Sequence, residues 1–421
     1  MATAHPSSST IIAERIPETE DYIDNLWSST LLCSVSDPQK EQEGTQNAYI
    51  SYLVTTESDF PTFQEPKFHV RRRFSDFVFF YNVIVRTHPA CAVPPLPDKQ
   101  RLEYITGDRF GPEFTLRRAS SLHLFLQRVS NHPILRRAPV LLAFLESQSW
   151  NGYMREQQHR LTSQVESTGV FDGLSDVLIN AFARIPKDKD NFIPAKQRMD
   201  KLGDNVSHTE KVMSRLIRHE QEWEADSYEF GNQVAKLAEL ELEMADVFRA
   251  FAKQNRAVGE AVFNLRESVD TNYVTSLRDM ETYVLSVKQL LKQREQKQLD
   301  HEALLDYLHK ATVERDVLAS GGGNGFLRSK VEDLRRVDHN IARIERLRKL
   351  DARLEVLKEE AKQANEETDA FDKETMRDLV DFERIKGLEM KESLGRLADD
   401  HIEFFRTLIE KWEETIPELE K

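Results

Sequence analysis

The second half of this chain contains almost no residue that would end a helix. No proline occurs between Pro194 and Pro417, and glycine is sparse there except in the SGGGNG run from Ser320 to Gly325. Proline and clustered glycine are the strongest interrupters of helices, so this composition predicts very long helices with a break at the glycine run. We expect three helices, over residues 195–265, 269–318 and 327–412.

Apolar side chains in these helices recur with the spacing of a coiled-coil seam. In the second helix, intervals of four and three alternate along Tyr273, Leu277, Met280, Val284, Val287 and Leu291. The third helix has similar spacing at Ile341, Ile344, Leu347, Leu350, Leu354 and Leu357. Helices far longer than the ordinary mean cannot be covered by one short-range core. The pattern therefore predicts an elongated antiparallel three-helix bundle, whose thin core would be completed when two chains pair.

The formal net charge of −14 conceals a strong segregation of charge along the chain. Residues 67–137 contain 13 basic and 5 acidic side chains, whereas residues 355–421 contain 11 basic and 21 acidic ones. This separation of basic and acidic segments favours a protein whose basic segment faces a lipid surface over one that binds nucleic acid. Just after the glycine run, residues 326–353 are again basic. The basic residues that we take as candidate membrane contacts there are Arg335, Arg336, Arg346 and Lys349.

The first half of the chain has the pattern of a small α+β domain. Three runs rich in β-branched residues predict strands at 29–35, 48–55 and 67–74, with DPQKEQEGTQN as a hairpin loop between the first two. Helical spacing follows at 76–87, 116–129 and 134–145. Residues 1–28 lack periodicity and are expected to form a flexible tail. We place this domain at residues 29–148.

One stretch of this domain combines features suited to an anionic, ring-shaped headgroup. Three arginines lead into an aromatic residue in VRRRFSDF, and PPLPDK follows about twenty residues later. Arginine offers a planar fork of donors that matches phosphate oxygens, and lysine acts as a point charge. A phosphorylated inositol is the natural ligand class. Each motif alone also has a plainer interpretation, a solvated strand end for RRR and a polyproline ligand for PPLP.

Taken together, RRRFSDF, PPLPDK and the later FTLRR resemble the PX domain, a family that binds phosphatidylinositol 3-phosphate. The resemblance implies that Arg73 holds the 3-phosphate, Phe74 packs under the inositol and Ser75 contributes near the phosphate. It also implies that Lys99 meets the phosphate leading to the lipid tail and that Arg118 bonds the ring hydroxyls. The family more often has tyrosine where this chain has Phe74, which keeps the stacking but removes one hydroxyl.

Two further segments are candidates for membrane contact. Tyr104 and Ile105 lie in the polar stretch after PPLP and could dip into the headgroup region, or simply pack on the domain. Residues 169–185 form one apolar helical stripe within a linker at 149–190. Its candidate membrane residues are Phe171, Leu174, Leu178 and Phe182. The stripe has little positive charge on its polar face, so docking on protein is an equal alternative to lipid insertion.

The chain has a PX domain, then an amphipathic segment, then a long helical bundle at residues 191–421. This order resembles that of the PX-BAR sorting nexins, and most of all their fungal, autophagy-related branch. The BAR domain of that family is a crescent-shaped dimer on curved membranes. The resemblance implies a homodimer or a heterodimer with another PX-BAR sorting nexin. It further implies retrieval of cargo such as SNAREs from endosomes toward the Golgi, and in fungi selective autophagy and cytoplasm-to-vacuole transport.

These expectations place the protein in the cytoplasm, peripheral on early endosomes and, in fungi, at the preautophagosomal structure. No apolar run approaches the ~18 residues that would cross a bilayer, and the opening MATAHPSSST lacks the apolar core of a signal peptide. Cys33 and Cys91 are the two cysteines, too few for a disulfide framework. No phosphate-binding glycine loop, metal-ligand spacing or nucleophile motif indicates an enzyme or calls for a cofactor. The leading alternative is a coiled-coil adaptor whose PX fold binds protein.

Overall fold

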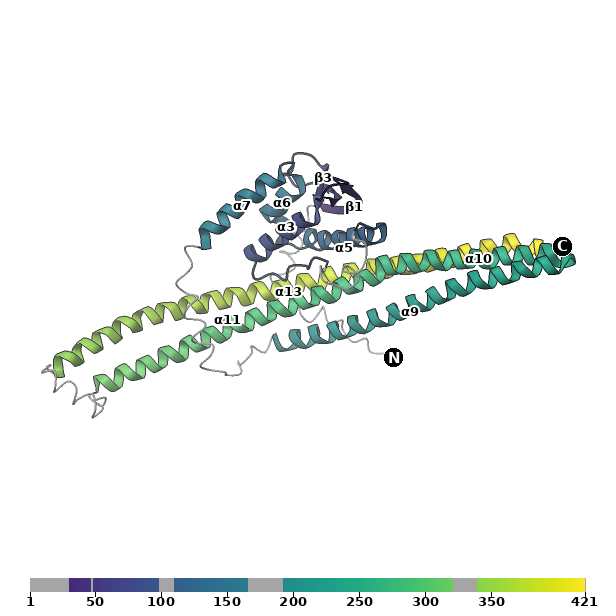
Figure 1. Ribbon diagram of the computed structural model, residues 1–421. Helices are drawn as coiled ribbons and strands as arrows, with labels where there is room; N and C mark the ends of the chain where they lie inside the picture. Colours follow the sequence, from purple (N-terminus) through teal and green to yellow (C-terminus); the bar gives the residue numbers. More distant parts are fainter. Residues whose placement is uncertain (1–29, 47, 98–109, 166–191, 321–338, 421) are drawn as a thin grey trace. The chain divides into compact units, whose positions relative to one another are not determined.

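The computed structural model describes residues 30–46, 48–97, 110–165, 192–320 and 339–420. The chain divides into two units. The first unit consists of Met1–Met154, Gln197–Lys288 and Leu379–Lys421, and the second of Arg155–Lys196 and Gln289–Asp378. Figure 1 shows the strands and helices with the labels used below.

The first unit contains the expected three-stranded antiparallel sheet, in the order β1-β2-β3. Its strands are β1 (Leu31–Glu41), β2 (Tyr49–Ser58) and β3 (Lys67–Arg73). β1 runs past the expected end at Val35, because a bulge between Ser36 and Gln39 lets pairing with β2 resume. Asp37 takes a positive φ of 45° at this bulge. Part of the expected hairpin loop is therefore strand.

Helices lie beside this sheet (Figure 1), and aromatic side chains form the core of the domain. The helices are α3 (Phe74–Thr87), α5 (Pro112–Ser130), the 3₁₀ turn η1 (Leu135–Arg137), α6 (Pro139–Glu146) and α7 (Trp150–Val165). The ring of Phe144 lies 4.9 Å from that of Phe77 and 4.7 Å from that of Phe80. All three rings are fully buried. Helices α3, α5 and α6 thus share one aromatic core with the sheet, to which α7 adds the ring of Trp150.

The helix expected at 134–145 begins later than the sequence indicated. Residues Leu135–Arg137 form a 3₁₀ turn, and α6 starts at Pro139. Ala138, which precedes that proline, is extended at φ −60° and ψ 128°. A residue before proline is disfavoured in the α region, and proline itself is preorganised for the first helical turn. Pro139 therefore sets the start of the helix.

The rest of the described chain is helical, but the first reversal of direction lies where the sequence did not suggest one. The helices are α9 (Phe192–Leu240), the 3₁₀ turn η2 (Leu242–Met244), α10 (Ala245–Val269), α11 (Thr275–Ala319) and α13 (His339–Leu419). Glu241 leaves the helical region at φ −112° and ψ 82°. The expected single helix over 195–265 is therefore wrong: it is two helices that meet at Glu241.

Contacts show that α10 returns antiparallel along α9. Arg266 pairs with Glu224 at 3.2 Å. Further along, a Cβ at Gly231 would lie only 3.0 Å from the carbonyl oxygen of Ala252. Glycine at that position therefore allows the two backbones to approach closely. This approach, and not a local turn motif, explains why the chain reverses in a stretch that reads AELELEM.

The break expected between 265 and 269 is absent, because α10 continues into α11 through the π-helical segment η3 (Asp270–Val274). The seam expected along the second helix is confirmed: its six residues are each at most 8% exposed. α13 packs against this helix, with the rings of Phe382 and Tyr283 4.9 Å apart. In the first unit, α11 and α13 therefore pack against each other along this seam.

The second unit is held by a buried ion pair and a small apolar cluster. Arg294 Nε donates to Asp372 Oδ1 at 2.7 Å, and its guanidinium lies 4.1 Å from the ring centre of Phe192. Leu354 and Leu357 of the third-helix seam are buried against Ala311, whereas Ile341 and Ile344 are 63% and 59% exposed in the single chain. Among the helices that the structure describes, none has a window long and apolar enough to cross a bilayer.

Candidate headgroup site and its junction with the helices

The three consecutive arginines at the end of β3 have three different environments. Arg71 supports the β1 bulge: its Nη1 lies 3.0 Å from Asp37 Oδ2, and its Nη2 donates to the Asp37 carbonyl oxygen at 2.7 Å. Its Nε donates to Ser51 Oγ at 2.9 Å. Arg71 is therefore engaged in holding the sheet edge.

Arg72 points the opposite way and is buried in the domain core. Its Nε and Nη2 donate to the carbonyl oxygens of Phe144 and Ser147 at 2.9 Å and 2.6 Å. The guanidinium also lies 5.3 Å from the ring centre of Trp150. Burial lowers the pKa of Arg72 to about 10, so the side chain stays charged at neutral pH. It links α6 and α7 to the sheet.

Arg73 remains at the surface, with a side chain 45% exposed, where β3 ends and α3 begins. Its backbone N–H donates to Asp76 Oδ2 at 2.9 Å, which closes the first turn of α3. Its guanidinium lies 5.7 Å from the ring centre of Tyr49. Alternation along the strand separates Arg73 from the buried Arg72, and of the three side chains that of Arg73 is the most exposed. Ser75, in the same first turn, is exposed.

Arg118 on α5 meets the arginine motif through Phe74. The Arg118 guanidinium lies 4.5 Å from the ring centre of Phe74 and 4.3 Å from that of Phe114. Phe114 precedes Arg118 by four residues, so both share one face of α5. Four of the residues expected in the site, Arg73, Phe74, Ser75 and Arg118, thus come together from two distant stretches of the chain.

Sequence reasoning missed the roles of Phe114 and Tyr49. The i, i+4 spacing of Phe114 and Arg118 on one helix was the available signal for the first. Tyr49 approaches Arg73 because β2 pairs with β3 in a register that sets Ser51 opposite Arg73. That register depends on tertiary pairing, and no local motif indicates it.

Several expected contact residues fall outside the described part of the chain. These are Lys99, Tyr104, Ile105, Phe171, Leu174, Leu178, Phe182, Arg335 and Arg336. Two lie within it, on α13. Lys349 is 76% exposed and pairs with Glu345 at 3.1 Å, and Arg346 is half-buried.

The same helix α5 also joins the long helices through a buried salt bridge. Arg128 donates from Nε and Nη2 to the two carboxylate oxygens of Glu389, at 2.7 Å and 2.6 Å. Ser276 Oγ donates to Glu389 Oε1 at 3.0 Å. Burial disfavours the charge on Arg128, but Glu389, Asp279 and Tyr283 together raise the pKa of Arg128 above its usual value.

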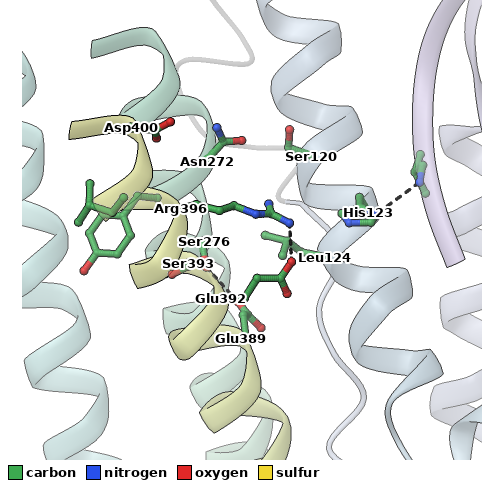
Figure 2. Close-up of a pocket in the computed structure, with 13 residues that line it drawn as sticks. Ser120, His123, Leu124, Asn272, Ser276, Glu389, Glu392, Ser393, Arg396 and Asp400 are labelled. Carbon is green, nitrogen blue, oxygen red and sulfur yellow. Dashed lines mark hydrogen bonds and ion pairs between the residues drawn. The ribbon is translucent and has the colours of Figure 1, made fainter. Parts of the chain in front are cut away.

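A polar pocket lies beside this salt bridge, between α5 and the long helices (Figure 2). Figure 2 shows Ser120 and His123 of α5 on one side and Glu392 and Arg396 of α13 on the other. The backbone N–H of Val35 donates to His123 Nδ1 at 3.4 Å, which requires that nitrogen to be unprotonated. Burial, helped by the charge of Arg396, lowers the pKa of His123. His123 is therefore neutral at neutral pH.

Comparison with known proteins agrees with this geometry. The family model of the PX domain matches residues 60–148, which include β3, both site helices and the headgroup residues on them. The cryo-EM structure of the tetrameric SNX-BAR protein Mvp1 superposes with a TM-score of 0.59, covering 91% of this chain and 99% of that one at 14% identity. The fold is therefore a PX domain followed by the helices of a BAR domain.

Curated relatives match over nearly the whole chain. Sorting nexin-4 of Emericella nidulans is 46% identical, over 97% of this chain and 88% of its own length. Sorting nexin-4 of Aspergillus fumigatus is 48% identical over 94% and 82%, and that of Candida glabrata is 35% identical over 90% of each. This chain therefore belongs to the PX-BAR sorting nexins, in the group of the fungal sorting nexin-4 proteins.

Proposed function

We propose that this sorting nexin binds phosphatidylinositol 3-phosphate on endosomal membranes through Arg73, Phe74, Ser75, Lys99 and Arg118. The observation that carries this proposal is that the three arginines have different environments. Arg71 and Arg72 make hydrogen bonds within the fold, whereas Arg73 stays exposed, next to Phe74 and its contact Arg118. A guanidinium over the Phe74 ring, with Arg73 adjacent to Phe74 in the chain, suits a phosphorylated sugar, since arginine binds phosphate oxygens in a bidentate manner and the ring can pack on the sugar.

In this proposal the protein acts by binding and not by catalysis. The PX domain occupies 29–148, the linker with its amphipathic stripe 149–190 and the BAR domain 191–421. Basic residues near a membrane add about 1 kcal/mol each, which suits Arg335, Arg336, Arg346 and Lys349 as secondary contacts. Apolar contacts with the membrane would come from Tyr104, Ile105 and the stripe at 169–185. Retrieval of cargo such as SNAREs and a part in selective autophagy extend the proposal to cellular function.

A soluble probe tests the headgroup site apart from the membrane. We expect inositol 1,3-bisphosphate, which lacks the lipid tail, to bind the full chain. Phe114→Ala should weaken this binding about 3-fold to 10-fold, because it removes one of the two rings that hold the Arg118 guanidinium. Titration calorimetry measures the effect. Phe114→Tyr keeps the ring and should bind like the parent, so equal binding by all three proteins would contradict a role for Phe114.

An exposed apolar face on α9 and α13 supports dimer formation. Trp223 is 46% exposed and its ring lies 5.9 Å from that of Phe404, while Phe405 is 57% exposed. Monomers rarely leave large contiguous apolar patches in water. We propose that a second PX-BAR chain, either the same or another sorting nexin, covers this face. Two headgroup sites on one dimer would then raise avidity by roughly 10²–10⁴.

Replacing one residue of this face should separate the chains. Phe405→Glu places a charge in the apolar surface, and we expect it to shift the protein from dimer toward monomer in analytical ultracentrifugation. Leu32→Glu is the matched control, since Leu32 is 64% exposed on β1, away from the proposed dimer face. A Phe405→Glu protein that sediments like the parent would remove this face from the proposed interface.

The adaptor alternative predicts different behaviour of the same site. If the PX fold bound protein, Arg73→Ala would leave recruitment to endosomes unchanged. If it binds lipid, Arg73→Ala should release the protein into the cytoplasm with its oligomeric state intact. Fluorescence microscopy of the tagged protein distinguishes the two outcomes.

A further inference from the structure

Two adjacent arginines on α5 contact different parts of the first unit. Arg118 lies over the rings of Phe74 and Phe114. Arg117 points elsewhere, because successive residues on a helix are about 100° apart. Its Nη2 lies 2.6 Å from Oδ2 of Asp270, in the π-helical segment between α10 and α11. One turn of α5 therefore contacts both the headgroup residues and the long helices.

Asp270 is itself held firmly by its surroundings. Its side chain is only 10% exposed, and Nη1 of Arg278 lies 3.8 Å from its second carboxylate oxygen. Arg278 is in turn fixed by Glu210 of α9 at 2.8 Å. The backbone carbonyl of Asp270 accepts a hydrogen bond from Thr275 Oγ1 at 3.1 Å. The carboxylate is thus a fixed anchor for Arg117, and a weakly solvated one, which strengthens their interaction.

The local backbone adds an independent observation. Asp270 opens a five-residue π-helical segment inside an otherwise α-helical stretch. Such segments are rare and frequently occur at functional sites. Here the segment lies directly against α5, near the turn that carries Arg118.

We propose that Asp270 and Arg117 are positioning residues for the headgroup site. By holding Arg117, Asp270 of the BAR helices fixes the first turns of α5 and so presents Arg118 between Phe74 and Phe114. This inference rests on the proposed binding of the inositol 3-phosphate headgroup. Since such coupling is reciprocal, a bound headgroup also restrains the π-helical segment.

A simple tether between the domains would behave differently. The buried Arg128–Glu389 salt bridge also joins α5 to the long helices, three turns further along the helix. If α5 only needed attachment, loss of either ion pair would have the same effect on the headgroup. The positioning account instead assigns the effect to Asp270 and Arg117 alone.

The test is titration of the full chain with inositol 1,3-bisphosphate. Asp270→Asn and Arg117→Gln should each weaken binding about 5-fold to 10-fold, although neither residue belongs to the headgroup site. Asp270→Glu, which keeps the charge, should restore most of the affinity. Glu389→Gln should bind like the parent, and Arg128→Lys, which loses the two-point contact with Glu389, serves the same purpose should Glu389→Gln not fold.

Hydrogen exchange provides a second readout that a purely structural role would not change. Addition of inositol 1,3-bisphosphate should slow amide exchange at 270–274 in the parent but not in Arg117→Gln. Parent-like affinity in Asp270→Asn, or an equal loss in Glu389→Gln or Arg128→Lys, would overturn the positioning role. Absence of binding in the parent itself, with Arg73→Ala no different, would overturn the proposed function and this inference with it.

Discussion

Arg73→Ala is expected to weaken binding of inositol 1,3-bisphosphate about 10-fold to 100-fold, because each charge-assisted hydrogen bond to phosphate contributes about 1.5–3 kcal/mol. The fold should survive, since the Arg73 side chain is 45% exposed and its ion pair to Asp76, at 3.4 Å, is long. The backbone N–H that bonds Asp76 and closes the first turn of α3 is retained by alanine. Titration calorimetry on the full chain measures the loss.

Arg86→Ala is the matched control, because Arg86 is an exposed arginine in the last turn of the same helix. It removes the same charge from the same domain without touching the site. Equal losses in the two variants would mean that the probe responds to overall charge and not to a headgroup site. A parent-like Arg73→Ala would remove Arg73 from the site.

Glu389→Ala is expected to lower the free energy of unfolding by about 3–5 kcal/mol, because it leaves the Arg128 guanidinium buried without its carboxylate. Arg128 is 2% exposed, and both of its bonds to Glu389 are shorter than 2.8 Å. Urea denaturation should show a lower midpoint. Amide exchange should increase in α5, which loses its deepest contact with the long helices.

Glu392→Ala provides the comparison, one turn further along α13. Glu392 pairs with Arg396 in an i, i+4 arrangement, with both side chains nearly half exposed. Exposed helical pairs of this kind contribute only about 0.3–0.5 kcal/mol. A Glu389→Ala protein no less stable than Glu392→Ala would show that the buried salt bridge does not hold α5 in place.

The elements that local pattern determines could be predicted from the sequence. Alternation and β-branching located the three strands, and the heptad intervals located the buried seam that includes Met280 and Val287. The reversal at Glu241 could not be predicted, since its surroundings contain neither glycine nor proline. It arises because α10 packs back along α9, with Gly231 permitting the approach to Ala252. Such tertiary packing overrides helix propensity.

The candidate site divides in the same way. The motif located Arg73 and Phe74, and the structure brings Arg118 to them. The motif could not reveal which of the three arginines are engaged in the fold, because the environments of Arg71 and Arg72 depend on partners far along the chain. Asp37 and Phe144 are 34 and 72 residues away from them. The partner of Arg128, 261 residues away, is equally invisible to local patterns.

We propose above that this sorting nexin recognises the 3-phosphate of a membrane phosphoinositide. The most direct measurement is cosedimentation of the full chain with vesicles that each contain one phosphoinositide, matched in total charge and repeated at two salt concentrations. We predict selective binding to vesicles with phosphatidylinositol 3-phosphate, lost in Arg73→Ala. Equal binding to every anionic vesicle, decreasing with salt and unchanged in Arg73→Ala, would contradict the account and leave nonspecific charge as the source of membrane binding.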